Sequence, residues 1–388
     1  MNILIIQQAP DLGGAELYLV DLVKRWSESG NQVTTYTNYE PLRNLFSKNG
    51  AKSDILPFNL DIMGNIRGFV KTLLMLPLAI PWYRGTLKLH RDNVDVILSA
   101  GQTEKLLMTL VAGRKSPPIV WLEYPPMERL LKRNLGIPKF IYKLLAKKAR
   151  RIITISQHTK KSLTDETKID ARNIRLVYPG SEITDRKELL RSQRAANAIR
   201  KSLGIGRKRV IGNISRIAQE KGQEYLLRAY ELVKKSHPRT ALVLAGRGPD
   251  EDRLKRLADR RNIRDVFFTG FVEDRNAMLA LSDVFVFPAA WELEGFGIVL
   301  VEAMLARKPI VAVKHGPVAE ILEDGKHALL VKNQDPKQLA KAILKLLSHP
   351  GYAGKLAKRA QERARENFAI KDSAVRMLNQ LREATRKT

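Results

Sequence analysis

The chain is 388 residues long, which indicates two domains or three. Hydrophobic residues make up 44% and charged residues 28%, a globular composition that excludes collagen-like, low-complexity and fully disordered chains. With 68 Lys and Arg against 40 Asp and Glu the net charge is +28, which favours polyanions or anionic membranes as partners. The absence of cysteine excludes disulfides, a thiolate nucleophile and cysteine-based metal sites, and fits a reducing, intracellular compartment.

The first half of the chain alternates short apolar strands with helical patterns. The run at 2–6 has no basic residues before it, so we interpret it as a buried strand and not as a signal peptide. A helix is expected over 16–29, ended by Gly30. Further strands are expected at 32–37, 94–98, 119–122, 151–155 and 174–178. This alternation predicts a parallel sheet with helices on both faces.

The most apolar stretch, 69–83, is too short to span a bilayer and contains two prolines. Two interpretations stay open. It is either a core helix that the prolines end, or a segment in the membrane interface with Trp82, Tyr83, Arg84 and Lys88 at headgroup level.

Residues 129–151 hold nine basic residues and no acidic one. After Pro138, an apolar stripe of Phe140, Ile141, Leu144 and Leu145 runs beside Lys139, Lys143 and Lys147, which are spaced four apart. The segment is either a docked helix with a solvated lysine face or a helix that lies on anionic lipid. We favour the membrane surface, because the charge is more one-sided than solubility requires.

Residues 184–207 carry seven basic and two acidic residues without a buried-strand pattern, which makes them the candidate interdomain connection. Strands are then expected at 209–214, 241–245, 266–269, 284–288 and 309–313, and helices at 223–235, 250–262 and 298–306. Helices are expected over most of 335–388. The predicted fold is α/β, with two tandem Rossmann-like doubly wound domains facing a cleft and a ligand at the carboxyl ends of the strands.

Three motifs carry candidate chemistry, and the first is Gly13-Gly14-Ala15-Glu16 at the start of the first helix. Glycines there allow a close approach to an anion at the helix N-terminus, although a tight turn alone also explains them. The motif is not the dinucleotide pattern G-x-G-x-x-G, so a nicotinamide cofactor gains no support.

The second motif is the loop 215–222, in which Arg216 and Lys221 suit a pyrophosphate. A solvated basic loop is the alternative. The third motif places Glu294 in a glycine-rich loop and Glu302 on the helix that follows. Such carboxylates can accept hydrogen bonds from vicinal hydroxyls, while the amides near Gly295 and Gly297 stay open to an anion. Glu302 lies in an otherwise apolar helix and needs a partner.

Together these segments resemble the retaining glycosyltransferases of family four (group 1), which have the GT-B fold. The resemblance runs from about 209 to 347, through ISRIAQEKG, LVLAGRGP and EGFGIVLVEAM, and extends to LGGAE in the first half. It implies an acceptor-side domain at 1–184, a basic connection at 185–207, a donor-binding domain at 208–364, and a helical segment at 365–388 that returns to the first domain.

The resemblance also implies roles for single residues. Arg216 and Lys221 would bind the donor pyrophosphate and stabilise the leaving phosphate. Glu294 would hold hydroxyls of the donor sugar, and Glu302 would hold the ribose. Backbone groups would contribute at Gly13, Gly14, Phe296, Gly297 and Ile298. Two cations on the departing phosphate stabilise the charge that grows there, so no metal and no cofactor are expected.

The chain departs from the family pattern in the first half, where many relatives carry a histidine near 119–124. Glu123 stands there instead. It is either catalytic, orienting a sugar hydroxyl or accepting a proton, or a surface carboxylate. Two further departures, His315-Gly316 and Pro179-Gly180-Ser181-Glu182, concern the donor-sugar contacts and the acceptor side.

The expected function is therefore metal-independent, retaining transfer of a hexose from a UDP- or GDP-linked donor. The expected acceptor is a membrane-linked glycan or glycolipid of cell-envelope polysaccharide synthesis. The expected location is the cytoplasm, peripheral on the inner membrane face through 129–151. One alternative is a basic nucleic-acid-binding protein, which 6% aromatic residues and the lack of nucleic-acid motifs disfavour. The other is a different GT-B enzyme, such as a phosphorylase or sugar-phosphate epimerase.

Overall fold

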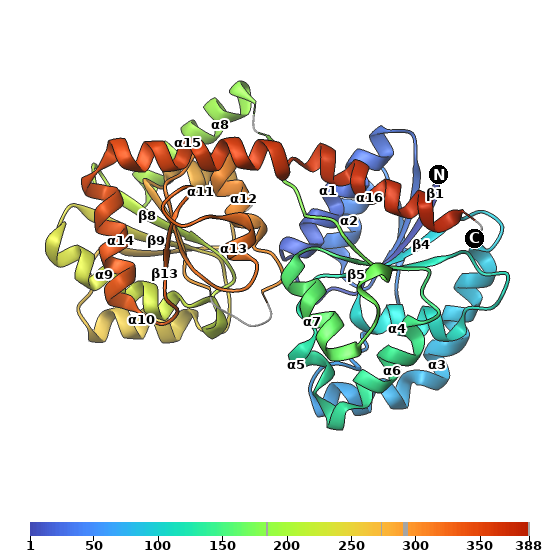
Figure 1. The fold of residues 1–388 in the computed structure, drawn as a ribbon. Coiled ribbons are helices and arrows are strands. Elements are labelled where there is room, and N and C mark those ends of the chain that lie inside the picture. Colours follow the sequence, from blue (N-terminus) through green and yellow to red (C-terminus); the bar gives the residue numbers. More distant parts are fainter. Residues whose placement is uncertain (184, 273, 290–293, 387–388) are drawn as a thin grey trace. The chain divides into compact units, whose positions relative to one another are not determined.

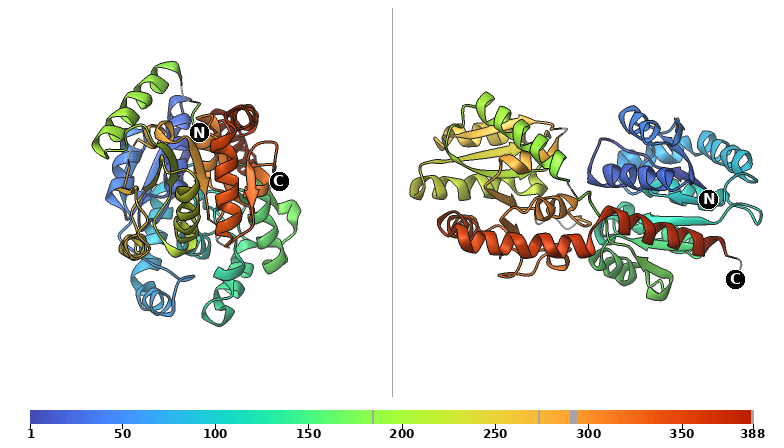
Figure 2. Two further views of the ribbon diagram at one scale, coloured as in Figure 1. Left: turned by 90° about the vertical axis from the view of Figure 1, so that its left-hand side faces the viewer. Right: turned by 90° about the horizontal axis from the view of Figure 1, so that it is seen from above.

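The computed structural model describes residues 1–183, 185–272, 274–289 and 294–386. The chain forms two compact units. Unit 1 comprises Met1–Gly180 and Ile370–Thr388, and unit 2 comprises Ser181–Ala369. Each unit contains one parallel sheet with helices on both faces, as the sequence predicts (Figures 1 and 2).

In the described part of unit 1, seven parallel strands form a sheet in the order β3-β2-β1-β4-β5-β6-β7. Successive strands run outward from β1 in one direction and from β4 in the other, so the order reverses between these two. The strands are β1 (Asn2–Ile6), β2 (Gln32–Thr37), β3 (Lys52–Ile55), β4 (Val96–Ser99), β5 (Ile119–Glu123), β6 (Arg151–Thr154) and β7 (Ile174–Leu176).

The helices of unit 1 form two layers. One layer covers the face to which Leu4 and Ile6 of β1 contribute, and contains α3 (Ile66–His90), α4 (Gln102–Val111), α5 (Glu128–Leu131), α6 (Ile137–Ala146) and α7 (Gln157–Thr167), with the short turns η1 (Asn134–Gly136) and η2 (Ala171–Asn173) (Figure 1). The other layer contains α1 (Gly14–Glu28), α2 (Glu40–Lys48) and α16 (Ile370–Thr385).

The C-terminal helix α16 packs on α1 within unit 1. The indole Nε1–H of Trp26 donates to the Ala374 carbonyl at 3.0 Å, and the hydroxyls of Tyr18 and Ser373 lie 2.8 Å apart. All of these side chains are buried. The expected return of the C-terminal segment to the first domain is therefore confirmed.

Helix α3 continues for 25 residues through both Pro77 and Pro81. The expectation that the prolines end a core helix is wrong in this respect. Both prolines lie on the exposed side of the helix. A backbone carbonyl that loses its hydrogen bond to a proline costs less where it faces solvent than where it is buried. The helix is partly a core helix, since Tyr83 is fully buried, but Leu74 is 75% exposed. Within the described residues, no helix is both long and apolar enough to cross a membrane.

In the described part of unit 2, six parallel strands form a sheet in the order β10-β9-β8-β11-β12-β13. The order reverses between β8 and β11. The strands are β8 (Arg209–Ile214), β9 (Thr240–Ala245), β10 (Val266–Gly270), β11 (Val284–Phe287), β12 (Ile310–Val313) and β13 (Leu329–Val331). The helices are α8 (Arg186–Ser202), α9 (Gln223–Ser236), α10 (Glu251–Arg260), α11 (Arg275–Leu281), α12 (Ile298–Leu305), α13 (Val318–Ile321), α14 (Pro336–Ser348) and α15 (Pro350–Asn367), with the turn η3 (Gln219–Lys221).

Helix α8 occupies the segment that we expected to connect the domains. It begins at an N-cap, Asp185, whose carboxylate accepts from the Glu188 N–H at 2.7 Å. Ala196 is buried in a small cluster with Val210 and Met278, and the helix packs on α11. The expectation of a connecting segment at 185–207 is therefore corrected: this stretch is a helix of unit 2 whose charges lie on its outer face.

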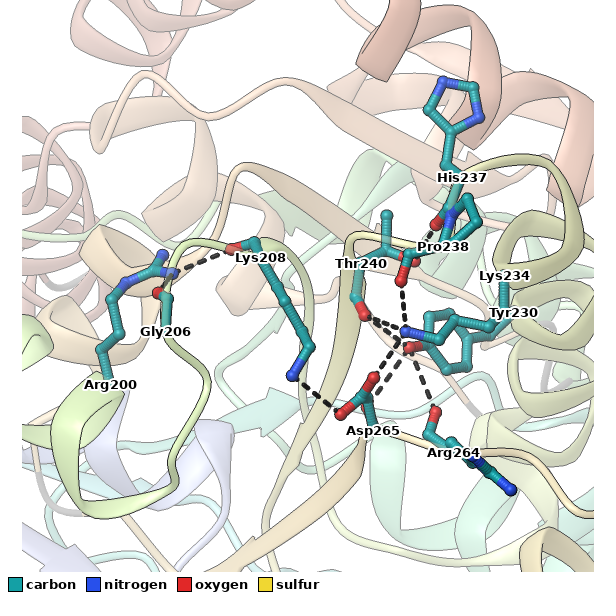
Figure 3. Close-up of polar contacts among 10 residues, drawn as sticks. All are labelled: Arg200, Gly206, Lys208, Tyr230, Lys234, His237, Pro238, Thr240, Arg264 and Asp265. Carbon is teal, nitrogen blue, oxygen red and sulfur yellow. Dashed lines mark hydrogen bonds and ion pairs between the residues drawn. The ribbon is translucent and has the colours of Figure 1, made fainter.

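A polar network joins the amino-terminal ends of β9 and β10 (Figure 3). The Lys234 ammonium donates to the Thr240 carbonyl at 2.7 Å and pairs with Asp265 at 2.6 Å. Lys208 contacts the other oxygen of Asp265 at 3.1 Å, and the Tyr230 hydroxyl donates to the Thr240 carbonyl at 3.0 Å. Since this edge is opposite the carboxyl ends of the strands, these charged groups hold the sheet together away from the predicted ligand site.

Candidate functional site

The predicted donor residues lie at the carboxyl ends of β8 and β11, where the strand order of unit 2 reverses. Ligands of open α/β sheets bind at such reversals. The loop after β8 carries Arg216 and Lys221, and the loop after β11 leads to Glu294. The structure thus places both motifs at one edge of the sheet.

Lys221 and Glu294 form an ion pair although they are far apart in the sequence. The Lys221 ammonium lies 2.6 Å from Glu294 Oε2, and both side chains are largely buried, with 17% and 13% of their surface exposed. Arg216 is more exposed and pairs with Glu220 one turn along the chain. A cation and a carboxylate therefore stand side by side, able to contact a phosphate and a hydroxyl of one ligand.

A glycine allows the two loops to approach each other so closely. Gly222 has a φ of +71°, and a Cβ there would lie 2.3 Å from the Pro288 carbonyl oxygen at the end of β11. Gln223 fixes the same loop, because its side-chain amide donates to the Ser215 hydroxyl at 2.7 Å and to the Arg216 carbonyl at 2.8 Å. This backbone contact brings Lys221 next to Glu294.

The glycine-rich turn before α12 has a second special backbone position. Gly297 is the N-cap of α12 with a φ of +88°, in the left-handed region that favours glycine. The side chain of Phe296 is buried and meets the Phe368 ring edge-on, with centroids 5.7 Å apart. The N-terminus of α12 therefore offers backbone N–H groups that have no partner within the helix. The residues at this N-terminus are Phe296, Gly297 and Ile298.

Glu302 has the partner that its apolar surroundings require. Its Oε1 lies 2.9 Å from Arg275 Nη2, and only 6% of its side chain is exposed. Its Oε2 makes no hydrogen bond within the described part of the chain. Burial raises the pKa of Glu302, and the Arg275 guanidinium offsets part of this rise. One oxygen of this buried carboxylate is thus paired with Arg275, and the other has no hydrogen-bond partner among the described residues.

In unit 1, Gly13 and Gly14 form the turn into α1, close to the reversal between β1 and β4. The Gly13 N–H donates to Glu16 Oε2 at 3.0 Å, and Gln7 donates to the other oxygen at 3.2 Å. Burial raises the pKa of Glu16. The approach of this turn to an anion stays a prediction, and the carboxylate of Glu16 already accepts from its first amide.

Comparison with known families covers most of the chain. Residues 196–367 match the model of the glycosyl transferases group 1, and residues 12–184 match that of glycosyltransferase family 4. The chain belongs to the group 1 glycosyltransferases of family 4. The predicted family and the GT-B fold are thereby confirmed.

Curated relatives of this group 1 glycosyltransferase include two enzymes with named activities. One is the GDP-mannose-dependent alpha-(1-6)-phosphatidylinositol monomannoside mannosyltransferase of Mycolicibacterium smegmatis, 31% identical over 46% of this chain and 49% of the relative. Another is the alpha-D-kanosaminyltransferase of Streptomyces kanamyceticus, 28% identical over 58% of each chain. The match spans about half the length of these relatives.

Among solved structures, Anabaena HepE in complex with UDP and glucose has a TM-score of 0.81, with 23% identity over 98% of both chains. WaaG, a glycosyltransferase involved in lipopolysaccharide biosynthesis, has a TM-score of 0.70, with 15% identity over 98% of this chain and 99% of WaaG. At these identities the likeness establishes the shared fold.

Glu123 is not a surface carboxylate, so that alternative is wrong. It is fully buried at the end of β5, with Oε1 2.7 Å from the Lys105 ammonium and 2.7 Å from the donating Tyr142 hydroxyl. Gln102 contacts its other oxygen at 3.4 Å. Its catalytic role stays a prediction, and the enclosed arrangement favours a structural one.

Arg275 and Lys105 are the residues that the motifs did not reveal. The need of Glu302 for a cation was evident from its apolar helix, but a sequence with 68 Lys and Arg offers no way to choose among them. Lys105 lies on α4 between buried residues, and such a lysine signals a buried carboxylate nearby. That signal could have paired it with Glu123.

Proposed function

We propose that this group 1 glycosyltransferase transfers a hexose from a UDP- or GDP-linked donor to an acceptor hydroxyl. The observation that carries the proposal is the Lys221–Glu294 ion pair, together with Arg216 in the same loop as Lys221 and the carboxylate of Glu302, of which one oxygen is paired. Cations suit the pyrophosphate of the donor, and the two carboxylates suit the hydroxyls of its two sugars.

In this proposal the chain stabilises the leaving group with its own cations. As the bond between the anomeric carbon and the phosphate oxygen breaks, negative charge grows on the phosphate. Arg216 and Lys221 stabilise that charge more strongly in the transition state than in the ground state, which accelerates the reaction. The acceptor hydroxyl then bonds to the anomeric carbon with retention and releases its proton. We propose that this chemistry needs no metal ion or cofactor.

The named relatives support a nucleotide-sugar donor without agreeing on the nucleotide. The mannosyltransferase of Mycolicibacterium smegmatis is named for GDP-mannose, whereas the structures of HepE were solved with UDP and with UDP-glucose. Acceptors named for relatives include phosphatidylinositol monomannoside and poly(ribitol-phosphate). A lipid-linked or glycan acceptor of the cell envelope is therefore our proposal for this chain.

We also propose that the enzyme is peripheral on the inner membrane face. Support comes from the exposed apolar side chains of η1 and α6: Leu135, Phe140 and Leu144 are 98%, 71% and 54% exposed. The predicted stripe is split, because Leu145 packs in the core, and Lys139 pairs with Glu166 at 2.8 Å. The exposed remainder is still both apolar and basic, as binding to anionic lipid requires.

The test is donor consumption with a panel of UDP- and GDP-sugars, with and without EDTA. Wild type should consume one donor in both conditions, and NMR of the product should show the anomeric configuration of the donor. Lys221→Ala and Glu302→Ala should each lower the rate by about 10²–10³.

Matched controls are Lys235→Ala and Glu362→Gln, whose side chains are 71% and 55% exposed in unit 2. They should keep the wild-type rate. If Lys221→Ala and Glu302→Ala also kept it, the site assignment would be wrong. If wild type consumed no donor, the proposed activity itself would fail.

A further inference from the structure

Unit 1 contains a basic cavity at the edge opposite the carboxyl ends of its strands. It has a volume of about 560 Å³ and lies between the end of α6, the beginning of β6, the end of α7 and the turn into β7. Seven of the described residues that line it are Lys or Arg, and Asp170 is the one carboxylate among them. None of the predicted donor residues lines this cavity.

Most of this positive charge is not neutralised. Asp170 is engaged by Arg172 at 2.7 Å, and Arg151 pairs with Glu383 at 2.6 Å. The ammonium groups of Lys143, Lys147 and Lys168 have no hydrogen bond or ion pair in the described part of the chain. Like charges gathered around a concave surface focus a positive potential, which favours an anion there.

The residue types indicate a phosphate. Arginine offers a planar fork of donors and lysine a compact charge, and both are the usual ligands of phosphate oxygens. The volume falls in the range of small-molecule sites and exceeds that of a single phosphate group, so a larger headgroup fits as well.

Helix α6 links this cavity to exposed apolar side chains. Phe140 and Leu144 lie one turn apart on the helix, and so do Lys143 and Lys147. Because Lys143 and Leu144 are consecutive, the two stripes lie on adjacent faces about 100° apart. The apolar stripe can then enter the acyl boundary while the lysines stay at the level of lipid phosphates.

We propose that this cavity binds the headgroup phosphate of an anionic phospholipid, with Phe140 and Leu144 inserted beside it. The inference rests on the proposed peripheral membrane location and assigns a specific site to it. A uniformly basic surface would bind lipid through any of its lysines, whereas this proposal requires the three that line the cavity.

The test compares two variants of equal charge in the full chain. Lys143→Ala/Lys147→Ala/Lys168→Ala removes the cavity lysines, and Lys48→Ala/Lys52→Ala/Lys332→Ala removes three exposed lysines elsewhere. Binding is measured by flotation with vesicles of phosphatidylcholine alone or of phosphatidylcholine mixed with phosphatidylglycerol, whose anionic headgroups attract basic segments. Donor consumption and thermal unfolding are recorded for each protein.

Wild type and the control variant should bind the anionic vesicles and not the neutral ones. The cavity variant should bind about a hundredfold more weakly, because each lysine near an anionic surface contributes about fivefold. Phe140→Ser/Leu144→Ser should also weaken binding, and its remaining binding should be fully lost in high salt. All variants should consume donor at the wild-type rate.

Equal weakening in the cavity and control variants would overturn the proposal in favour of diffuse charge. Saturable binding of inorganic phosphate without binding of vesicles would assign the cavity to a soluble phosphate and overturn the lipid. Failure of wild type to bind any vesicle would overturn both this inference and the membrane location. Continued donor consumption in that case would leave the proposed transferase activity standing.

Discussion

The buried ion pair in unit 1 leads to a prediction about stability and catalysis together. Lys105 and Glu123 are both fully buried and lie 2.7 Å apart, and Tyr142 donates to the same carboxylate oxygen. Burial lowers the pKa of Lys105, while the Glu123 carboxylate opposes that shift. Each charge is therefore tolerated in the core mainly because the other is present.

Replacing one member leaves the other without a counter-charge. For Lys105→Met we expect a loss of about 3–5 kcal/mol in the free energy of unfolding, since an unpaired carboxylate then stays in the core. For a unit of this size, about 2–4 °C of midpoint temperature corresponds to 1 kcal/mol, so the transition of unit 1 should fall by roughly 10 °C.

Replacing all three polar groups should behave differently. Lys105→Met/Glu123→Leu/Tyr142→Phe removes both charges and the hydroxyl that would otherwise lose its acceptor. Its stability should lie within about 1 kcal/mol of wild type, because apolar replacement of a buried pair avoids the cost of desolvation. Differential scanning calorimetry of the single and triple variants measures both values.

The reasoning is refuted if Lys105→Met unfolds at the wild-type temperature, or if the triple variant is as unstable as the single one. Donor consumption and transfer in the triple variant separate the two roles of Glu123. Full activity in a folded triple variant shows that the carboxylate is structural, and loss of transfer alone would place Glu123 in catalysis.

Three further predictions concern other carboxylates. Arg275→Ala should raise the pKa of Glu302 further, because the guanidinium no longer stabilises the carboxylate. The donor KM should increase about tenfold and the acidic limb of its pH profile should move to higher pH, and Arg275→Lys should restore part of the loss. An unchanged pH profile would contradict this prediction. Burial raises the pKa of Glu104 to about 7, so the folded protein loses stability as pH rises from 4.5 through 7 and the carboxyl group ionises. In urea unfolding, Glu104→Gln should increase the free energy of unfolding by up to about 3 kcal/mol at pH 8 and leave it unchanged at pH 4. An equal effect at both pH values would refute this cause. Burial raises the pKa of Asp265, but its two lysine partners lower the pKa by more than burial raises it. Asp265→Asn should therefore lower the free energy of unfolding by about 1–2 kcal/mol at pH 7, and by progressively less as pH falls below 3.8. Urea unfolding at pH 7 and at pH 3 checks this difference.

The sequence predicts the strands at the centre of each sheet well. The bounds of β1, β2 and β8 agree with the expected ranges residue for residue, because these strands are rich in apolar or β-branched residues. One edge strand of each sheet, β3 and β13, was not predicted, whereas the opposite edges β7 and β10 were. β3 is polar and largely exposed and β13 has three residues, so neither carries the apolar run that reveals a buried strand.

Helix α8 was missed for a related reason. Its composition is dominated by charge, and few of its side chains are buried, so its pattern is close to that of a linker. Likewise, the prolines of α3 argue for a helix end locally, whereas packing of Phe69 and Tyr83 on the sheet keeps the helix continuous. Tertiary contacts decide both cases, and local patterns do not contain them.

The candidate site was predicted as a set of residues, but its contacts were not. Motif order and the parallel-sheet rule suffice to place Lys221 and Glu294 at one edge of unit 2. Their direct pairing depends on the close backbone contact between Gly222 and Pro288. That contact depends on the paths of two loops, and the sequence does not reveal these paths. The partners Arg275 and Lys105 come from elements that carry no motif.

The chain passes from unit 1 to unit 2 after Gly180 and back again before Ile370, so unit 2 is inserted within the sequence of unit 1. During synthesis, the first 180 residues must wait for the last helix before the surface of α1 around Trp26 is covered. Unit 2 has all of its elements as soon as residue 369 leaves the ribosome. We therefore expect unit 2 to complete folding first, although it is synthesised second. We also expect that a single proteolytic cut at one of the two connections leaves the units joined covalently through the other connection.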